Sequence, residues 1–306
     1  MVVEEDLAMD TPNRAERIVA HRPRRPRRGK VPFNGVALTR VLYYVVLFGG
    51  ATVMMVPFLW MISVSLKEPG QVFVYPPQWI PDPIVWANYG TVWTTVPFAM
   101  FLLNTTKIAI LVTLGQFLTC SLGAYAFARL EFPGRDHLFL AYLGTMMIPY
   151  HVTLVPVFIL MRYLGWVDSH LSLIVPACFS AFGTFLLRQF FLTIPRELED
   201  AARIDGCSEF GIYSRIVLPL AKPALATLGV FTLLWSWNDF IGPLVFINST
   251  EKKTLTLGLA SFQGMYTTDW TLLMAASVMA LLPLIIIFIF AQRYFVEGIT
   301  LSGIKG

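Results

Sequence analysis

Six long apolar stretches alternate with polar segments along this chain of 306 residues. Each stretch is comparable in length to the ~20 residues that an α-helix needs to cross a bilayer. A spanning segment must satisfy its backbone hydrogen bonds internally, so the pattern predicts helices rather than an open sheet. The predicted spans are residues 41–65, 101–127, 138–161, 169–191, 221–247 and 270–292.

The composition supports this interpretation. Hydrophobic residues make up 56% of the chain and charged residues only 14%, whereas a soluble globular protein carries about 25% charged residues. We therefore expect an all-α, polytopic membrane protein. It would have a basic tail without packed structure at 1–40, a transmembrane domain at 41–292 and a short tail at 293–306.

The distribution of basic residues predicts the orientation of the spans. Eighteen of the 23 Lys and Arg residues fall in the N-terminal tail, the 128–137 loop, the region from Arg188 to Lys222 and the C-terminal tail, and four fall on the other side. Cytoplasmic loops carry the excess of positive charge. Both termini and the segment near 192–220 are therefore predicted to be cytoplasmic.

One of these cytoplasmic segments, Pro195 to Pro219, is a polar island between two spans. We expect a helix with Thr193 as N-cap and Pro195 in its first turn, because proline fits that position. Gly206 would end it in a left-handed C-cap. A second short helix over 208–217 would complete a bent elbow, with Ala201 and Ala202 forming a shallow exposed face.

The elbow carries a recognisable motif. Asp200-Ala201-Ala202, then Gly206, then I-V-L-P at 216–219 resembles the EAA loop of permease subunits of bacterial ATP-binding-cassette (ABC) importers. F-A-R-L-E-F-P-G-R at 127–135, W-N-D-F at 237–240 and the terminal G-I-K-G are similar to the maltose-type second permease subunit of the carbohydrate branch. The usual first residue of the motif is Glu, so Asp200 departs from it and has a shorter side chain.

The resemblance implies a type I ABC importer permease in the bacterial cell (inner) membrane, with six transmembrane helices and a cytoplasmic coupling helix. It would translocate a sugar or oligosaccharide delivered by an extracytoplasmic solute-binding protein. The implied partners are a second permease subunit, forming a heterodimer, and two ATPase subunits that bind ATP and Mg²⁺. The chain itself contains no G-x-x-x-x-G-K-[ST] phosphate loop, so we expect a transport subunit without enzymatic activity.

The resemblance also assigns candidate site residues. Those expected to contact the ATPase from the elbow are Glu199, Asp200, Ala201, Ala202, Asp205, Gly206, Ile216, Leu218 and Pro219. The C-terminal residues Gly303, Lys305 and Gly306 resemble a family tail that also approaches the ATPase.

Polar residues at membrane depth are candidates for the substrate pathway, because such residues are costly there. The candidates are Asn238, Asp239, Trp237, Tyr150 and Gln116. Asp239 has two interpretations: it lines the pathway, or it caps a broken helix or pairs with Lys107. Gln116 and Asn104 are candidates for hydrogen bonds between helices.

Other classes of function are less well supported. The loop at 248–269 either reaches toward the binding protein or is a passive connector. The cargo could instead be another polar solute, such as glycerol phosphate or a polyamine. A secondary transporter would need further intramembrane carboxylates and inverted repeats. The sequence shows no catalytic constellation, metal-ligand spacing or basic nucleic-acid-binding face.

Overall fold

The computed structural model describes residues 33–264 and 267–303 of the chain. Within these ranges the regular elements are helices, and the only β pairing is an isolated bridge between Gln263 and Thr268. The all-α prediction is therefore confirmed. Residues 1–32 of the predicted basic tail, and Lys305 and Gly306 of the predicted C-terminal contact, lie outside the described residues.

The chain divides into two compact units, residues 1–56 and 57–306. The described part of the first unit is the beginning of α1 (Phe33–Ser65), which therefore starts before the predicted boundary at residue 41. The second unit contains the end of α1 and all the later helices. They are α2 (Ala87–Thr95), α3 (Phe98–Arg129), α4 (Arg135–Gly144), α5 (Tyr150–Tyr163), α6 (Leu171–Ala177), α7 (Ala181–Phe191), α8 (Glu197–Ile204), α9 (Glu209–Ile212), α10 (Leu218–Leu220), α11 (Lys222–Asn238), α12 (Ile241–Phe246), α13 (Leu255–Leu259) and α14 (Trp270–Gly303).

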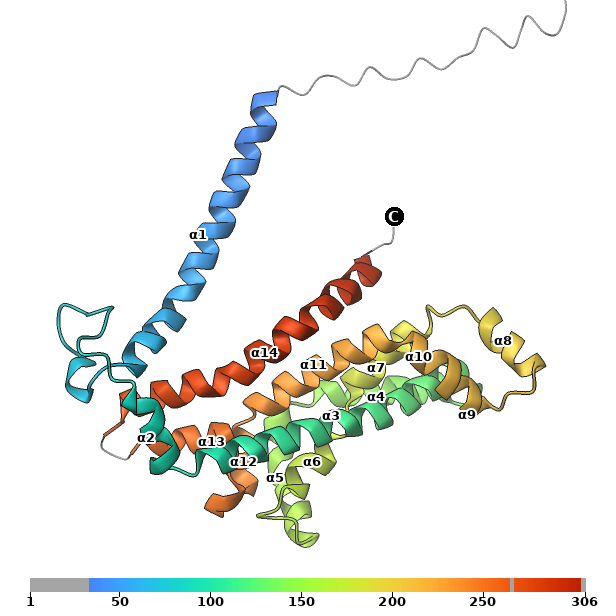
Figure 1. Cartoon of the computed structure of the whole chain (residues 1–306). Coiled ribbons are helices and arrows are strands. Elements are labelled where there is room, and N and C mark those ends of the chain that lie inside the picture. The colour runs from blue at the N-terminus through green and yellow to red at the C-terminus, as the bar shows by residue number, and fades with distance from the viewer. Residues whose placement is uncertain (1–32, 265–266, 304–306) are drawn as a thin grey trace, which may run out of the picture. The chain divides into compact units, whose positions relative to one another are not determined.

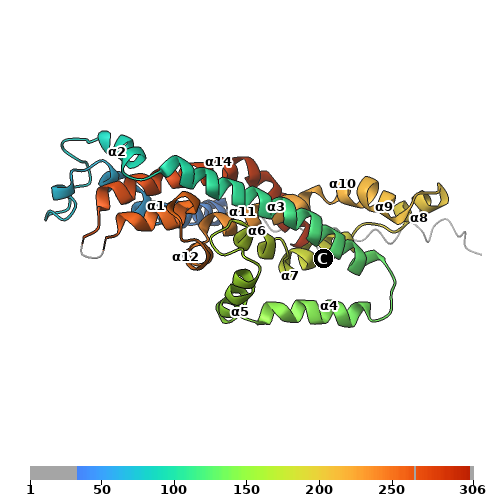
Figure 2. The ribbon, with the colours of Figure 1, turned by 90° about the horizontal axis from the view of Figure 1, so that it is seen from below.

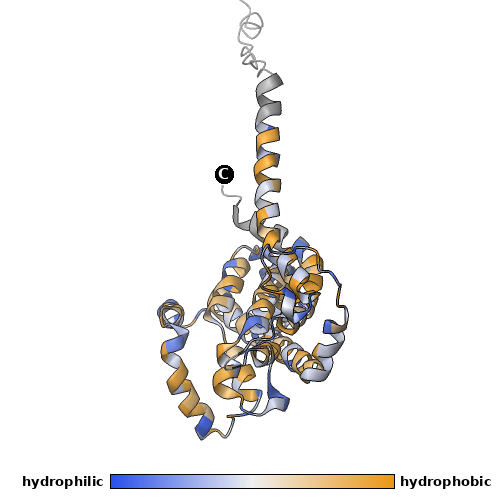
Figure 3. Ribbon diagram, turned by 90° about the vertical axis from the view of Figure 1, so that its left-hand side faces the viewer, coloured by the Kyte–Doolittle hydropathy of each residue, from blue (hydrophilic) through white to orange (hydrophobic). Residues whose placement is uncertain are grey.

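Within the second unit, α3, α7 and α11 run side by side (Figure 1). The short helices α8 to α10 lie at one end of this bundle, and α2 and α13 lie at the other. Seen from below, α4 follows the margin of the bundle (Figure 2). Apolar residues dominate the long helices, and hydrophilic residues gather at helix ends and in loops (Figure 3).

The predicted spans differ in continuity. Within the described residues, four helical segments are long and apolar enough to cross a membrane: Thr39–Ser65, Phe98–Arg129, Leu171–Phe191 and Trp270–Phe290. Two bent helix pairs raise the number to six if each is one span. The third predicted span is broken before Pro149, where α4 and α5 meet at 99°. The sixth continues as α14 to Gly303, beyond its predicted end at 292.

α3 supplies hydrogen bonds where a neighbouring span is interrupted. Between α6 and α7 the helix is interrupted, so backbone carbonyls there accept no hydrogen bond from within a helix. Gln116 Nε2 donates to the Ala177 carbonyl at 2.8 Å, and Thr119 Oγ1 donates to the Cys178 carbonyl at 2.5 Å. Such breaks are tolerated in a membrane when neighbouring helices re-satisfy the freed groups. The predicted interhelical role of Gln116 is confirmed, whereas Asn104 bonds to the Glu251 and Lys253 carbonyls of a loop.

Two glycines of α3 test how closely these helices approach. A Cβ at Gly115 would lie 2.1 Å from the Cys178 Sγ, whereas one at Gly123 would lie 3.4 Å from the Thr184 Cγ2. We predict that Gly115→Ala destabilises the protein by about 1–3 kcal/mol through overpacking. Gly123→Ala should be tolerated. Thermal unfolding of the two purified variants checks this, and equal midpoints would contradict the close packing at Gly115.

Candidate functional site

The elbow is built from local signals that the sequence supplies. Three acids, Glu197, Glu199 and Asp200, occupy the first turn of α8, where the helix dipole favours negative charge. Gly206 follows with a φ of 81°, the left-handed conformation that glycine adopts without a steric penalty. The Ser208 side chain accepts a hydrogen bond from the Gly211 N–H and starts α9.

The predicted start of α8 was wrong by three residues. Thr193 does not cap this helix, because its hydroxyl donates to the Phe190 carbonyl and finishes α7 instead. Pro195 precedes the helix, which begins at Glu197 after Arg196 as N-cap. The second helix is also shorter than predicted: α9 ends at Ile212, and a π-helical turn over Tyr213–Val217 leads to α10.

An ion pair attaches α8 to the last residue of α3. The Arg129 Nε and the Glu199 Oε1 are 2.7 Å apart, and both side chains are 2% exposed. Arg129 Nη2 also donates to the Ile194 carbonyl at 2.7 Å, at the entry to the elbow. Burial raises the pKa of Glu199, and the positive charges of Arg129, Arg203 and Arg196 oppose that shift. The charge of Glu199 thus depends on these guanidinium groups.

Arg203 extends this contact across the elbow. Its guanidinium lies 2.9 Å from Asp200 Oδ1 and 3.0 Å from Glu209 Oε1. Tyr125, one turn before the end of α3, donates to Glu209 Oε2 at 2.7 Å. Arg203, Asp200 and Glu209 border a polar cleft of about 500 Å³ between the end of α3 and the elbow. The elbow is therefore fixed to the bundle by charged and hydroxyl groups as well as by apolar packing.

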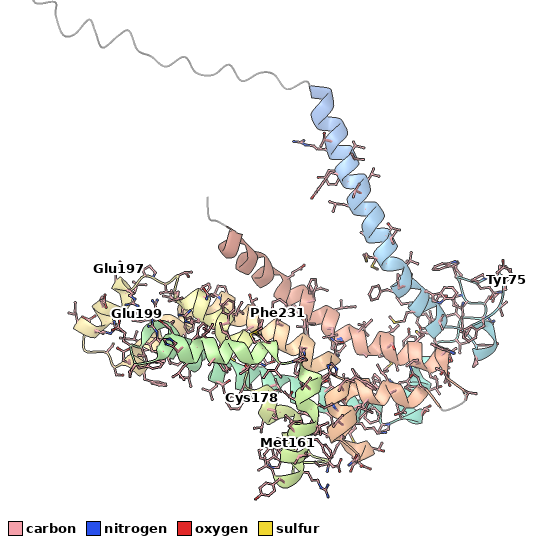
Figure 4. All side chains as sticks on the ribbon, turned by 180° about the vertical axis from the view of Figure 1, so that it is seen from behind. Tyr75, Met161, Cys178, Glu197, Glu199 and Phe231 are labelled. Atoms are coloured by element: carbon pink, nitrogen blue, oxygen red, sulfur yellow. The ribbon has the colours of Figure 1, made fainter. Side chains whose placement is uncertain are left out.

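The structure divides the predicted coupling residues into three groups. Asp200, Ala201, Asp205, Gly206 and Pro219 are exposed, Ile216 and Leu218 are half-buried, and Glu199 and Ala202 are buried. The expectation that both alanines form an exposed face was wrong, because Ala202 packs into the core cluster that contains Ile194, Ile212 and Val217. Glu199 likewise faces the interior of the elbow (Figure 4).

Sequence reasoning missed two exposed apolar side chains on the elbow. Ile204 is 87% exposed and Phe210 is 69% exposed. Both lie in a segment whose charge drew attention to its polar residues. The signal that could have found them was an apolar residue close to a glycine that ends a helix. At such a turn the apolar side chain has no neighbouring surface against which it could be buried.

A cavity of about 590 Å³ lies among the membrane helices, bordered by α5, α6, α11 and the start of α7. Its walls are mostly aromatic and aliphatic, with Tyr150, Gln116 and Asp239 among the polar groups. Of the described residues that line it, Asp239 is the only Asp, Glu, Lys, Arg or His. Phe231 and Cys178 mark this middle region, between Glu199 at the elbow and Tyr75 at the far end (Figure 4).

The α11 face that lines the cavity follows a helical spacing of four. Phe231, Trp235 and Asp239 all contribute to the wall. The predicted residues Trp237 and Asn238 fall on other faces. Trp237 is buried in a cluster with Phe98 and Leu273, and Asn238 Nδ2 bonds to the Leu234 carbonyl of its own helix at 2.8 Å. These two residues therefore do not line this cavity, since neighbours in sequence do not share a helix face.

Asp239 combines the two interpretations left open by the sequence. Its Oδ1 accepts a hydrogen bond from the Gly242 N–H at 3.1 Å in the first turn of α12, so it caps that helix. Among the described residues no ion pair joins it to Lys107. The break in the fifth predicted span begins at Asp239, since α11 ends at Asn238 and α12 begins at Ile241.

At the end of the bundle away from the elbow, Asp168 clamps two loops together. Its Oδ1 accepts hydrogen bonds from the Asn248 and Ser249 N–H groups at 2.9 Å each, and the Lys252 Nζ lies 3.1 Å from Oδ2. Hydrogen bonds from the Ser249 hydroxyl and these N–H groups hold the pKa of Asp168 far below its usual range. The clamp joins the loop before α6 to the loop after α12.

Comparison with known proteins places these features in a family. Residues 120–301 match the family described as "Binding-protein-dependent transport system inner membrane component". The arabinooligosaccharides transport system permease protein AraQ of Halalkalibacterium halodurans is 42% identical over 203 residues, covering 66% of this chain and 73% of that protein. The sn-glycerol-3-phosphate transport system permease protein UgpE of Pectobacterium atrosepticum is 33% identical, covering 85% and 95%.

A solved structure shares the fold. One chain of a bacterial ABC transporter involved in the import of the acidic polysaccharide alginate superposes with a TM-score of 0.77 and 25% sequence identity. The match covers 85% of this chain and 97% of that chain. The helical, multi-span architecture is therefore that of an ABC importer permease, as predicted.

The capping role of Asp239 predicts a difference between two substitutions. Asp239→Asn keeps a side-chain acceptor and should leave stability and transport near their original values, because Asn is as good a capping residue as Asp. Asp239→Ala removes the acceptor and should cost about 0.5–2 kcal/mol. Thermal unfolding and vesicle uptake check both. A large loss of transport in a normally folded Asp239→Asn variant would show that the charge itself is required.

The clamp at Asp168 predicts a dependence on pH. A carboxylate whose pKa is lowered on folding contributes stability above its unfolded value, about 3.9, and loses it as the pH falls further. Amide-exchange protection at Asn248 and Ser249 should thus be constant from about pH 8 to about pH 5 and decrease only below about pH 4. Asp168→Asn is the control that should remove the acid-range change. Loss of protection already near pH 6 would contradict the assignment.

Proposed function

The chain belongs to the binding-protein-dependent transport system inner membrane component family, and from that premise we propose that it is the permease subunit of an ABC importer for a sugar or short oligosaccharide. One observation carries the proposal. A single chain combines an aromatic-lined cavity among membrane helices with an exposed elbow at one end of the same bundle. The chain is a transport component, and its relatives are permease proteins rather than enzymes.

The cavity wall supports an uncharged carbohydrate as cargo. Aromatic side chains such as Phe182, Phe231 and Trp235 offer flat apolar faces to sugar rings, and Gln116 and Tyr150 offer hydrogen-bonding groups. A phosphate ester would meet the carboxylate of Asp239 and no lining Lys or Arg. The arabinooligosaccharide permease among the relatives agrees with this choice. Glycerol phosphate is the second candidate, because a related permease carries that name.

The elbow supports docking to a separate ATPase. Ile204 and Phe210 are apolar and exposed, and Asp200, Ala201 and Asp205 lie beside them. A soluble partner with an apolar groove would bury this surface, which we call the docking face. ATP and Mg²⁺ would be bound by two such ATPase subunits, and a second permease would complete the membrane conduit.

The charge pattern supports an orientation for this assembly. The excess of Lys and Arg at the elbow side argues that the docking face and both termini are cytoplasmic. The 248–269 loop and the Asp168 clamp would then face the extracytoplasmic binding protein. Closure of the ATPase subunits would move the elbow and switch the cavity between outward-facing and inward-facing states, an equilibrium biased by ATP.

Two exposed isoleucines test the docking face. Ile204→Ser should weaken co-purification with the ATPase subunits by roughly thirtyfold in affinity, or about 2 kcal/mol, if Ile204 is an interface hot spot. Ile80→Ser is the matched control, since Ile80 is 80% exposed but lies in the loop between α1 and α2. Equal ATPase binding by the two variants would contradict the proposed interface.

The substrate class needs its own measurement. Vesicles that contain the complete importer and its binding protein should accumulate labelled arabinotriose but not glycerol 3-phosphate. Uptake of glycerol 3-phosphate alone would favour the second candidate and contradict the carbohydrate assignment.

A further inference from the structure

One face of the C-terminal part of α3 is connected to the elbow. Ser121, Tyr125 and Arg129 are spaced four residues apart and therefore share a face. Ser121 Oγ lies 2.7 Å from the Tyr213 hydroxyl, Tyr125 donates to Glu209 at 2.7 Å, and Arg129 pairs with Glu199 at 2.7 Å. We call these three contacts the α3 ladder. Each contact joins α3 to a different segment of the elbow.

The ladder ends at the most deeply buried charge of the elbow. Glu199 is 1% exposed, whereas the neighbouring Asp200 has a side chain that is 64% exposed. Removing one partner of a buried ion pair strongly destabilises the protein, because the remaining charge is left buried without a counter-charge or water. The end of α3 and α8 therefore cannot separate freely. Glu199 is also unavailable to a docking partner in this arrangement, which is at odds with the role predicted from the sequence.

α3 is suited to carry a displacement. Each of the other candidate spans has an interruption or a proline inside it: α1 has Pro57, α14 has Pro283, and the remaining described spans are bent or broken. α3 runs unbroken for 32 residues, about 48 Å at the usual rise. Its middle reaches the cavity at Gln116, which also accepts a hydrogen bond from Thr232 of α11 at 2.7 Å.

We propose that the buried Glu199–Arg129 ion pair makes α3 the element through which movement of the elbow reaches the cavity, with Glu199 as a positioning residue and not a contact to the ATPase. This inference rests on the proposed function, since it assumes that a partner moves the elbow. The alternative is that the elbow acts only through its covalent connections to α7 and α11, with the ion pair serving local stability.

A reporter in the cavity separates these accounts without knowledge of the sugar. Thr153 lines the cavity on α5, and Thr153→Cys, with the three native cysteines replaced by alanine, gives one reactive thiol there. The readout is its labelling rate by a small maleimide in the assembled complex, with and without a non-hydrolysable ATP analogue. A change of about tenfold on nucleotide binding is expected, within the usual range of coupling between sites.

Three elbow variants are then compared in this background. Glu199→Gln should abolish most of the nucleotide-dependent change while the complex still co-purifies with its ATPase subunits. Glu197→Gln is the matched control, because Glu197 is exposed on the same helix (Figure 4), and it should retain the full change. The double variant Arg129→Met, Glu199→Met removes both buried charges, so it avoids an unpaired charge and should assemble but remain uncoupled.

The outcomes separate the inference from its premise. A full nucleotide-dependent change in Glu199→Gln or in the double variant would overturn the role of the ion pair and leave the proposed function intact. Should Glu199→Gln fail to assemble, the double variant decides the question. If the unaltered elbow itself shows no assembly with ATPase subunits, or no nucleotide effect in the cavity, the proposed function fails first.

Discussion

The structure depends on how charge is accommodated where the elbow meets the bundle. An elbow rich in acids and arginines would be expected to lie loosely in water, yet Arg129 and Glu199 are both removed from solvent and lie 2.7 Å apart. Arg129 also binds the Ile194 carbonyl, so one side chain fixes both the entry to the elbow and its first helix. Beneath them Ile212, Val217 and Leu228 form a continuous apolar cluster. The elbow is therefore attached to the bundle through the face opposite Ile204 and Phe210.

The same helix that anchors the elbow also maintains the cavity. A cavity inside a membrane protein requires helices that stop short, and each interruption frees backbone groups that lipid cannot satisfy. α3 supplies Gln116 and Thr119 to the carbonyls freed between α6 and α7. Asp239 likewise accepts a hydrogen bond from a backbone N–H in the first turn of α12. Gln116, Thr119 and Asp239, polar residues at membrane depth, thus satisfy backbone groups at the interruptions, and Gln116 and Asp239 also border the cavity.

Much of this architecture could be predicted from the sequence, because long apolar stretches and a polar island leave few alternatives. The position of the elbow, its first-turn acids and the left-handed Gly206 follow from local chemistry. The orientation of individual side chains could not be predicted from local chemistry. Glu199 and Ala202 were expected at the surface, and only the packing of α8 on α3 shows that they face inward. Trp237, Asn238 and Asp239 were all predicted for the substrate pathway, but only Asp239, at a spacing of four from Phe231 and Trp235, lines the cavity. The direction in which a side chain points is decided by contacts between distant segments, such as that of Arg129 with Glu199. No local sequence pattern reveals these contacts.

If the anchored elbow presents its exposed face to an ATPase on the cytoplasmic side, one cysteine at the highly exposed Ile204 should report this. In a background without native cysteines, the thiol is labelled with a membrane-impermeant reagent in oriented vesicles. We expect labelling only from the cytoplasmic side, and protection when the ATPase subunits are present. Labelling from the extracytoplasmic side, or equal labelling with and without those subunits, would show that the elbow does not dock in this way.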